Sequence, residues 1–221
     1  MAEVNHIPEK IQAIRRSIPP HVEILAAVKT RTLEEVRAAY DAGLRIFGHN
    51  YVQEAQAMIA ADDLGSEWHL IGHLQRNKAK EAVKLFNMIE SVDSLRLAQE
   101  LENRCAQIKK KMPVLIEVNS GSEDNKTGIM PQDAAQLAEY LNTCQYLRLR
   151  GLMTMGPLTG EPELARPYYR ETQRLFEEIS RMGLENTEMR VLSMGMSYSY
   201  QVAIEEGANL VRLGTVIFGA R

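Results

Sequence analysis

The sequence predicts a (β/α)8 barrel of the TIM type, and three observations support that prediction. Eight short apolar or β-branched runs occur along the 221 residues, and each of the first seven is followed by a stretch of helical period. Strands joined by helical crossovers pair in parallel. Eight such repeats favour a closed barrel, and a doubly wound sheet with a similar strand count is the alternative. We expect one domain over 1–221, because no linker rich in proline or glycine divides the chain.

The expected elements alternate along the chain. The strands are short apolar runs that cover 23–28, 45–47, 68–71, 88–91, 113–118, 147–153, 189–192 and 210–213. The helices that follow them cover 32–40, 51–61, 75–85, 94–111, 131–142, 165–182 and 200–206. The first of these helices has Thr32 as its cap, Glu35 at the capping-box position and Gly43 as its stop. Pro131 opens the fifth, where its missing N–H costs nothing. A further helix over 5–17 is expected to cover the barrel where the eighth helix is cut short.

Composition limits the classes of function. The chain has 26 basic and 29 acidic residues and a formal net charge of −3, which excludes nucleic-acid binding by a basic surface as its main activity. No apolar run approaches the length of a membrane span, and the N-terminus lacks an apolar signal core, so we expect a cytoplasmic protein. Cys105 and Cys144 form no paired motif, which excludes a disulfide framework and a cysteine-rich zinc site.

Candidate functional residues gather at the predicted carboxyl ends of the strands, where barrels of this type place their active sites. The polar or ionisable positions just past the strands are Lys29, His49, Asn50, His73, Asp93, Asn119, Thr154, Ser193, Ser197, Arg212 and Thr215. Lys29 follows a buried strand, so desolvation is expected to favour the neutral amine that attacks a carbonyl. The alternative is a lysine that reaches from the rim to water, and this residue alone favours that alternative.

The last two strands are followed by segments that can hold a phosphate. Arg212, Gly214 and Thr215 end the chain's last strand, and 193–197 ends the one before it. Backbone N–H groups at the start of a terminal helix bind phosphate, and barrels often use these two loops for it. The alternative is a glycine turn and a serine cap without a ligand. His69 and His73 have no carboxylate at a metal-ligand spacing after them, so we expect local hydrogen bonds and no metal site.

Several motifs in this sequence resemble the pyridoxal-phosphate homeostasis proteins of the YggS/PROSC type. They are AVKT (27–30), FG (47–48), NYVQEA (50–55), WHLIGHLQRNK (68–78), SVDS (91–94), GLMTM (151–155), LSMGMS (192–197), VRLGT (211–215) and IFGAR (217–221). The resemblance covers essentially the whole chain. It implies the barrel fold of the alanine racemase N-terminal domain, binding of pyridoxal 5′-phosphate (PLP) as a Schiff base, and a role in vitamin B6 homeostasis and delivery without an established reaction.

The resemblance also implies roles for particular residues. Lys29 would form the Schiff base and Arg212 would face the pyridine nitrogen. Asn50 would line the ring pocket. The phosphate would be held by Ser197, beside Met196, and by Gly214 and Thr215. PLP-accepting apo-enzymes would be the partners, and we expect a monomer.

The sequence departs from the family pattern at two positions near the expected site. His49 stands where the family usually has glutamate, and Tyr198 stands where it commonly has glycine or aspartate. We expect the His49 imidazole at the barrel mouth near Lys29, and Tyr198 crowding the phosphate. An enzyme is therefore the competing class, either racemase-like or a divergent or engineered barrel with a pocket remodelled around His49 and Tyr198, where His49 is the candidate catalytic residue. The chain stops at Arg221 without the extra domain that supplies a racemase's second base, which favours the binding protein.

Overall fold

Eight parallel strands close into a barrel in which each strand pairs with the next along the chain and β8 pairs with β1. The computed structural model describes residues 4–123, 125–157 and 160–220. The strands are β1 (Glu23–Ala27), β2 (Ile46–His49), β3 (Glu67–Leu70), β4 (Met88–Val92), β5 (Met112–Val118), β6 (Leu147–Thr154), β7 (Thr187–Ser193) and β8 (Leu210–Leu213). The prediction of a (β/α)8 barrel is confirmed, and the doubly wound sheet is excluded by the closure.

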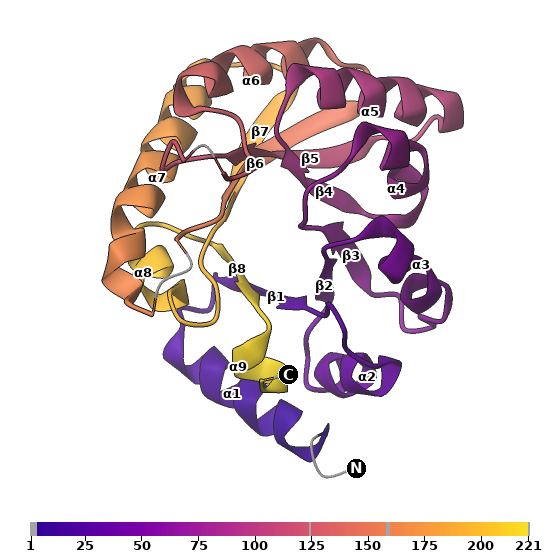
Figure 1. Cartoon of the computed structure of the whole chain (residues 1–221), viewed down its shortest axis with the longest axis vertical. Coiled ribbons are helices and arrows are strands. Elements are labelled where there is room, and N and C mark those ends of the chain that lie inside the picture. Colours follow the sequence, from indigo (N-terminus) through magenta and orange to yellow (C-terminus); the bar gives the residue numbers. More distant parts are fainter. Residues whose placement is uncertain (1–3, 124, 158–159, 221) are drawn as a thin grey trace.

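The helices form a ring outside the strands (Figure 1). They are α1 (Ile7–Ser17), α2 (Leu33–Asp41), α3 (Val52–Ala60), α4 (Ala79–Leu85), α5 (Leu95–Ile108), α6 (Ala134–Thr143), α7 (Arg166–Arg181), α8 (Tyr200–Glu205) and α9 (Thr215–Phe218). The 3-10 turns are η1 (Val4–His6), η2 (Arg76–Lys78), η3 (Pro131–Asp133) and η4 (Pro162–Ala165). Among the described residues, no helix is long and apolar enough to cross a membrane. Asp124 and Arg221, which the sequence places in a loop and in the last motif, lie outside the described residues.

Helix boundaries follow the local signals where the sequence carries them. Thr32 accepts the N–H of Glu35 and the Glu35 carboxylate accepts the N–H of Thr32, which is the expected capping box. The helix expected to reach 111 ends at Ile108, because Lys109 adopts a left-handed conformation with φ of 54°. Glycine usually takes that position, so a lysine there gave no stop signal. The N-terminal helix α1 packs against α2 and α9, as expected from the short last helix.

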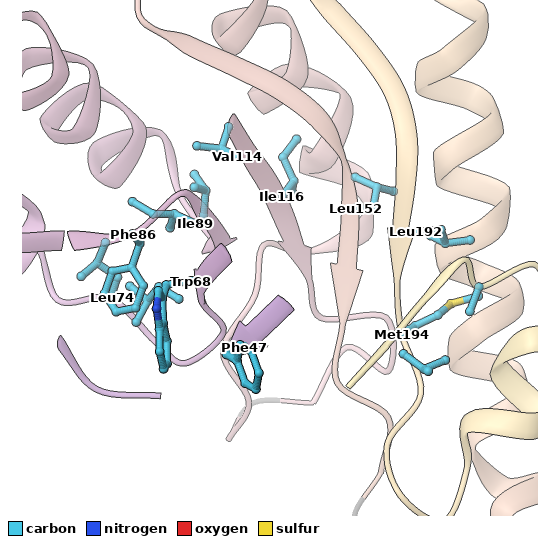
Figure 2. Packing of buried hydrophobic residues seen from close by; sticks show 14 of the residues in the cluster. Phe47, Trp68, Leu74, Phe86, Ile89, Val114, Ile116, Leu152, Leu192 and Met194 are labelled. Carbon is cyan, nitrogen blue, oxygen red and sulfur yellow. The ribbon is translucent and has the colours of Figure 1, made fainter. Parts of the chain in front are cut away.

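The sheet separates an apolar outer layer from a partly polar interior. Phe47 and Trp68 pair in register and face the helices, with their ring centroids 5.5 Å apart (Figure 2). The residues next to each of them along β2 and β3 face inward, because side chains alternate across a strand. Inside the barrel, Met88, Leu115 and Met153 form a second, smaller apolar cluster. Ionisable side chains occupy much of the remaining interior, and they define the floor of the site.

Candidate functional site

A cavity of about 530 Å³ opens at the carboxyl ends of β1, β7 and β8. It is lined by Ala27, Lys29, Met196, Ser197, Tyr198, Arg212, Gly214, Thr215 and Val216. Six of the seven cofactor-binding residues expected from the sequence therefore surround one space. Three segments distant in sequence meet there because β8 pairs with both β1 and β7.

Lys29 lies two residues past β1 at the edge of this cavity. Val28 is still held by the sheet, since its N–H donates to the carbonyl of Gly48 at 3.0 Å. Thr30 then turns the chain with a φ of 63°. The Lys29 side chain is exposed, which agrees with the alternative of a lysine that reaches from the rim to water, the one that this residue alone favoured. Its amine is available to a ligand from the solvent side.

Backbone donors converge at the start of α9. The hydroxyl oxygen of Ser197 accepts the N–H groups of Gly214 and Val216, both at 3.3 Å. Both N–H groups are thus paired with the serine hydroxyl at the edge of the cavity, which is also the contact expected of a serine cap without a ligand. At position 214 an added Cβ would lie 3.3 Å from the Ala27 carbonyl oxygen, so glycine allows the close approach of this segment to β1. The two segments expected to hold a phosphate do meet at this cavity, and the phosphate itself stays a prediction.

Arg212 forms the floor of the cavity and is 4 % exposed. Its guanidinium donates to the carbonyl and hydroxyl oxygens of Ser193 at 2.8 and 2.7 Å and to the carbonyl of Thr154 at 2.7 Å. A further contact of 3.3 Å reaches the Met155 sulfur. Four contacts fix the plane of the guanidinium, so its position does not depend on a ligand.

The structure places His49 away from this cavity. His49 pairs in register with Leu70, which belongs to the outer core, whereas an added Cβ at Gly48 would meet the side chains of Leu25 and Ile71. Alternation along β2 therefore turns the imidazole outward, where it is 2 % exposed. Burial lowers its pKa, an effect partly opposed by the Glu54 charge, and its Nδ1 has no hydrogen-bond partner among the described residues. The expectation that it lies at the barrel mouth near Lys29 is wrong.

Asn50 lines a neighbouring cavity of about 250 Å³ with His73 and Lys78. It is the one expected cofactor-binding residue that does not line the cavity beside Lys29 in the described part of the chain. His73 forms an ion-pair contact of 3.1 Å with Asp93, and His69 contacts Glu67 on its own strand and Glu90 on β4, so only the Glu67 contact is local as expected. Within the described ranges, no group of three or more His, Cys, Asp or Glu residues is arranged to hold a metal ion.

Two buried glutamates were missed by reasoning from the sequence. Glu90 is fully buried in β4 and binds Ser193 and His69. Glu117 in β5 accepts the Thr127 hydroxyl at 2.5 Å, while its second oxygen lacks a partner in the part of the chain that the structure describes. Burial raises the pKa of Glu117, although the Thr127 hydrogen bond opposes this. The available signal was an acidic residue inside an apolar strand, on the same face as Met88 or Leu115.

The chain belongs to the class of (β/α)8 barrels that carry a cavity at the carboxyl ends of their strands, and its sequence similarities identify the family. The family described as "Alanine racemase, N-terminal domain" matches residues 3–221. The pyridoxal phosphate homeostasis protein of Aquifex aeolicus is 42% identical over 200 residues, which cover 90% of this chain and 87% of that protein. The chain belongs to the family of pyridoxal phosphate homeostasis proteins.

Solved structures of one relative agree with this assignment. PipY of Synechococcus elongatus without PLP superposes with a TM-score of 0.91 at 34% identity. The same protein with PLP bound gives a TM-score of 0.88 at 33% identity, and in both cases the match covers 96% of this chain and 100% of PipY.

Proposed function

We propose that this chain binds PLP in the cavity beside Lys29 and acts in vitamin B6 homeostasis. The observation that supports this most strongly is the meeting of three unlike groups around one space: an accessible amine, converging backbone donors and a fixed guanidinium. PLP carries an aldehyde, a phosphate and a pyridine ring, which match these groups in turn. The names of the relatives and the PLP-bound structure of PipY support the same ligand.

Lys29 is proposed as the residue that attaches the cofactor. Its Nζ would attack the aldehyde carbon, a C=N bond would form as a Schiff base, and the carbonyl oxygen would leave as water. Ser197, Gly214 and Thr215 would hold the phosphate, with Met196 beside them, and Arg212 would face the ring nitrogen. When bound, PLP supplies an electrophilic carbon and an electron-accepting ring. Asn50 lines a different cavity from Lys29. We include it among the ring-binding residues on the family resemblance alone.

Reduction with borohydride tests the attachment. The chain is loaded with PLP, reduced and digested, and mass spectrometry should place the pyridoxyl label on Lys29. Lys29→Ala should lose the label, whereas the matched variant Lys78→Ala, which alters the adjacent cavity, should keep it. A label on Lys78 or Lys126, or none after incubation with excess PLP, would contradict the proposal.

The cellular role adds two further proposals. A single domain acting as a monomer would store the cofactor and release it to apo-enzymes. Sedimentation of the loaded chain tests the monomer. Reactivation of a PLP-free transaminase by the loaded chain, compared with an equal amount of free PLP, tests delivery: a rate no greater than that with free PLP would argue against direct transfer.

A further inference from the structure

Five polar side chains form a continuous chain through the barrel interior, from the floor of the cavity to the opposite end. Arg212 donates to the Ser193 hydroxyl at 2.7 Å, and that hydroxyl donates to Glu90 Oε2 at 2.5 Å. Glu90 Oε1 lies 2.6 Å from His69 Nδ1, and His69 Nε2 lies 3.0 Å from Glu67 Oε1. The residues come from β8, β7, β4 and β3, so barrel closure brings them together.

His69 carries a positive charge at neutral pH. Both of its ring nitrogens face carboxylate oxygens, which accept hydrogen bonds, so both nitrogens must donate. Burial alone lowers its pKa, but the hydrogen bonds and charges of Glu67 and Glu90 outweigh burial and raise the pKa to about 9. Arg190 is the other charge that acts on this end of the chain, through Glu67.

The positive charge of His69 determines how much of the negative charge of Glu90 acts on the Arg212 guanidinium. The negative charge of Glu90 is offset by direct contact with His69, which also contacts the half-exposed Glu67, while Arg212 donates to uncharged oxygens of Ser193 and Thr154. No carboxylate of the described chain pairs directly with the guanidinium. The other ionisable groups that act on it are Tyr169 and Glu117, and both have a raised pKa, which favours their neutral forms. Glu90 has the largest stabilising effect on the guanidinium charge, so the net charge at the cavity floor depends on how far His69 offsets Glu90.

We propose that His69 is a positioning residue that acts through Glu90 and Ser193: it holds Arg212 fixed and offsets the charge of Glu90 that acts on the guanidinium, and thereby keeps the ring of a bound cofactor unprotonated. The inference rests on the proposed function. Its physical basis is that a neighbouring positive charge disfavours protonation of a ring nitrogen. An unprotonated ring is a weaker electron sink, which suits a protein that holds PLP without consuming it.

The test replaces the charges of the buried pair one at a time in the full chain. His69→Gln leaves Glu90 without its counter-charge, so Arg212 becomes partly compensated. The absorbance of the PLP-loaded chain is followed against pH to find the midpoint at which the ring nitrogen is protonated. This midpoint should rise by about 0.5 to 1 pH unit. The double variant His69→Gln/Glu90→Gln removes both charges and should return the midpoint to the wild-type value. A purely structural role predicts that the second substitution adds to the disturbance instead of reversing it.

The possible results distinguish a failure of this inference from a failure of the proposed function. If wild-type chain takes up PLP but His69→Gln leaves its midpoint unchanged, or the double variant moves it further away, the inference is wrong and the proposed function stands. If wild-type chain takes up no PLP, the proposed function fails and the inference fails with it. Should His69→Gln not fold, Glu90→Gln is compared with the double variant. Loss of the imidazolium removes a positive charge and should raise the midpoint. A midpoint that stays the same or falls overturns the inference.

Discussion

The protonation of buried His69 should make folding stability depend on pH in a direction opposite to that of most carboxylates. Its pKa rises from 6.5 to about 9 in the folded chain, because contacts with Glu67 and Glu90 outweigh the cost of burial. A raised folded-state pKa gives stability that is fully present below pH 6.5 and is lost as the pH rises through 9. At about 1.4 kcal/mol for each pH unit, the contribution is on the order of 3 kcal/mol.

Urea unfolding of the chain without added cofactor measures this contribution. We compare wild type, His69→Gln and the control His6→Gln at pH 6, 7.5 and 9, since the His6 side chain is 67% exposed. Wild type and the control should lose on the order of 3 kcal/mol of unfolding free energy between pH 6 and 9 relative to His69→Gln. Burial raises the pKa of Cys105 and Cys144 to about 11, so their thiols stay protonated over this range. Parallel curves for wild type and His69→Gln would refute the reasoning.

Three further predictions concern the site and its support. Tyr198 lines the cavity and is 41% exposed, so Tyr198→Gly should tighten PLP binding several-fold in a fluorescence titration, whereas His49→Gln, behind the sheet, should leave affinity within about twofold. The PLP-loaded chain should exchange the α-proton of alanine in deuterated water far below ordinary enzyme rates, because the Arg212 charge weakens the ring as an electron sink; exchange at such rates would indicate an acid–base pair. Tyr169→Phe removes the buried hydrogen bond of 2.7 Å to Ser199 and should lower the unfolding free energy by about 1 kcal/mol in urea.

The fold was predictable because its signals are local. Each apolar run is flanked by residues that end a strand, and each helix carries its own period of 3.6. The Thr32 and Glu35 pair defined one helix start to the residue. Where the signal was absent, as at Lys109, the boundary was missed by three residues. Eight repeats of one supersecondary unit then leave few ways to close a sheet.

The sequence predicted which residues form the candidate site better than it predicted where their side chains lie. Residues just past parallel strands meet at one end of a barrel whatever their sequence separation, so Lys29, Ser197 and Arg212 could be grouped before their distances were known. His49 was misplaced because its strand was expected to end at Phe47. In the structure β2 continues for two more residues, so alternation places Gly48 inside the barrel and His49 on the same outer face as Phe47. The register with Leu70 then fixes it outside the barrel.

The charges inside the barrel could not be derived from the sequence, because each depends on a partner from a distant strand. Glu90 is separated from Ser193 by 103 positions, and His69 is separated from Glu90 by 21, yet the three side chains are consecutive in one hydrogen-bonded chain. A lone buried histidine would be neutral, and a lone buried glutamate would be protonated. Between Glu90 and Glu67, His69 keeps its proton, and its positive charge offsets the carboxylate of Glu90 beneath Arg212. The cationic floor of the cavity is therefore a property of barrel closure, and substitutions at residues far from the ligand should alter it.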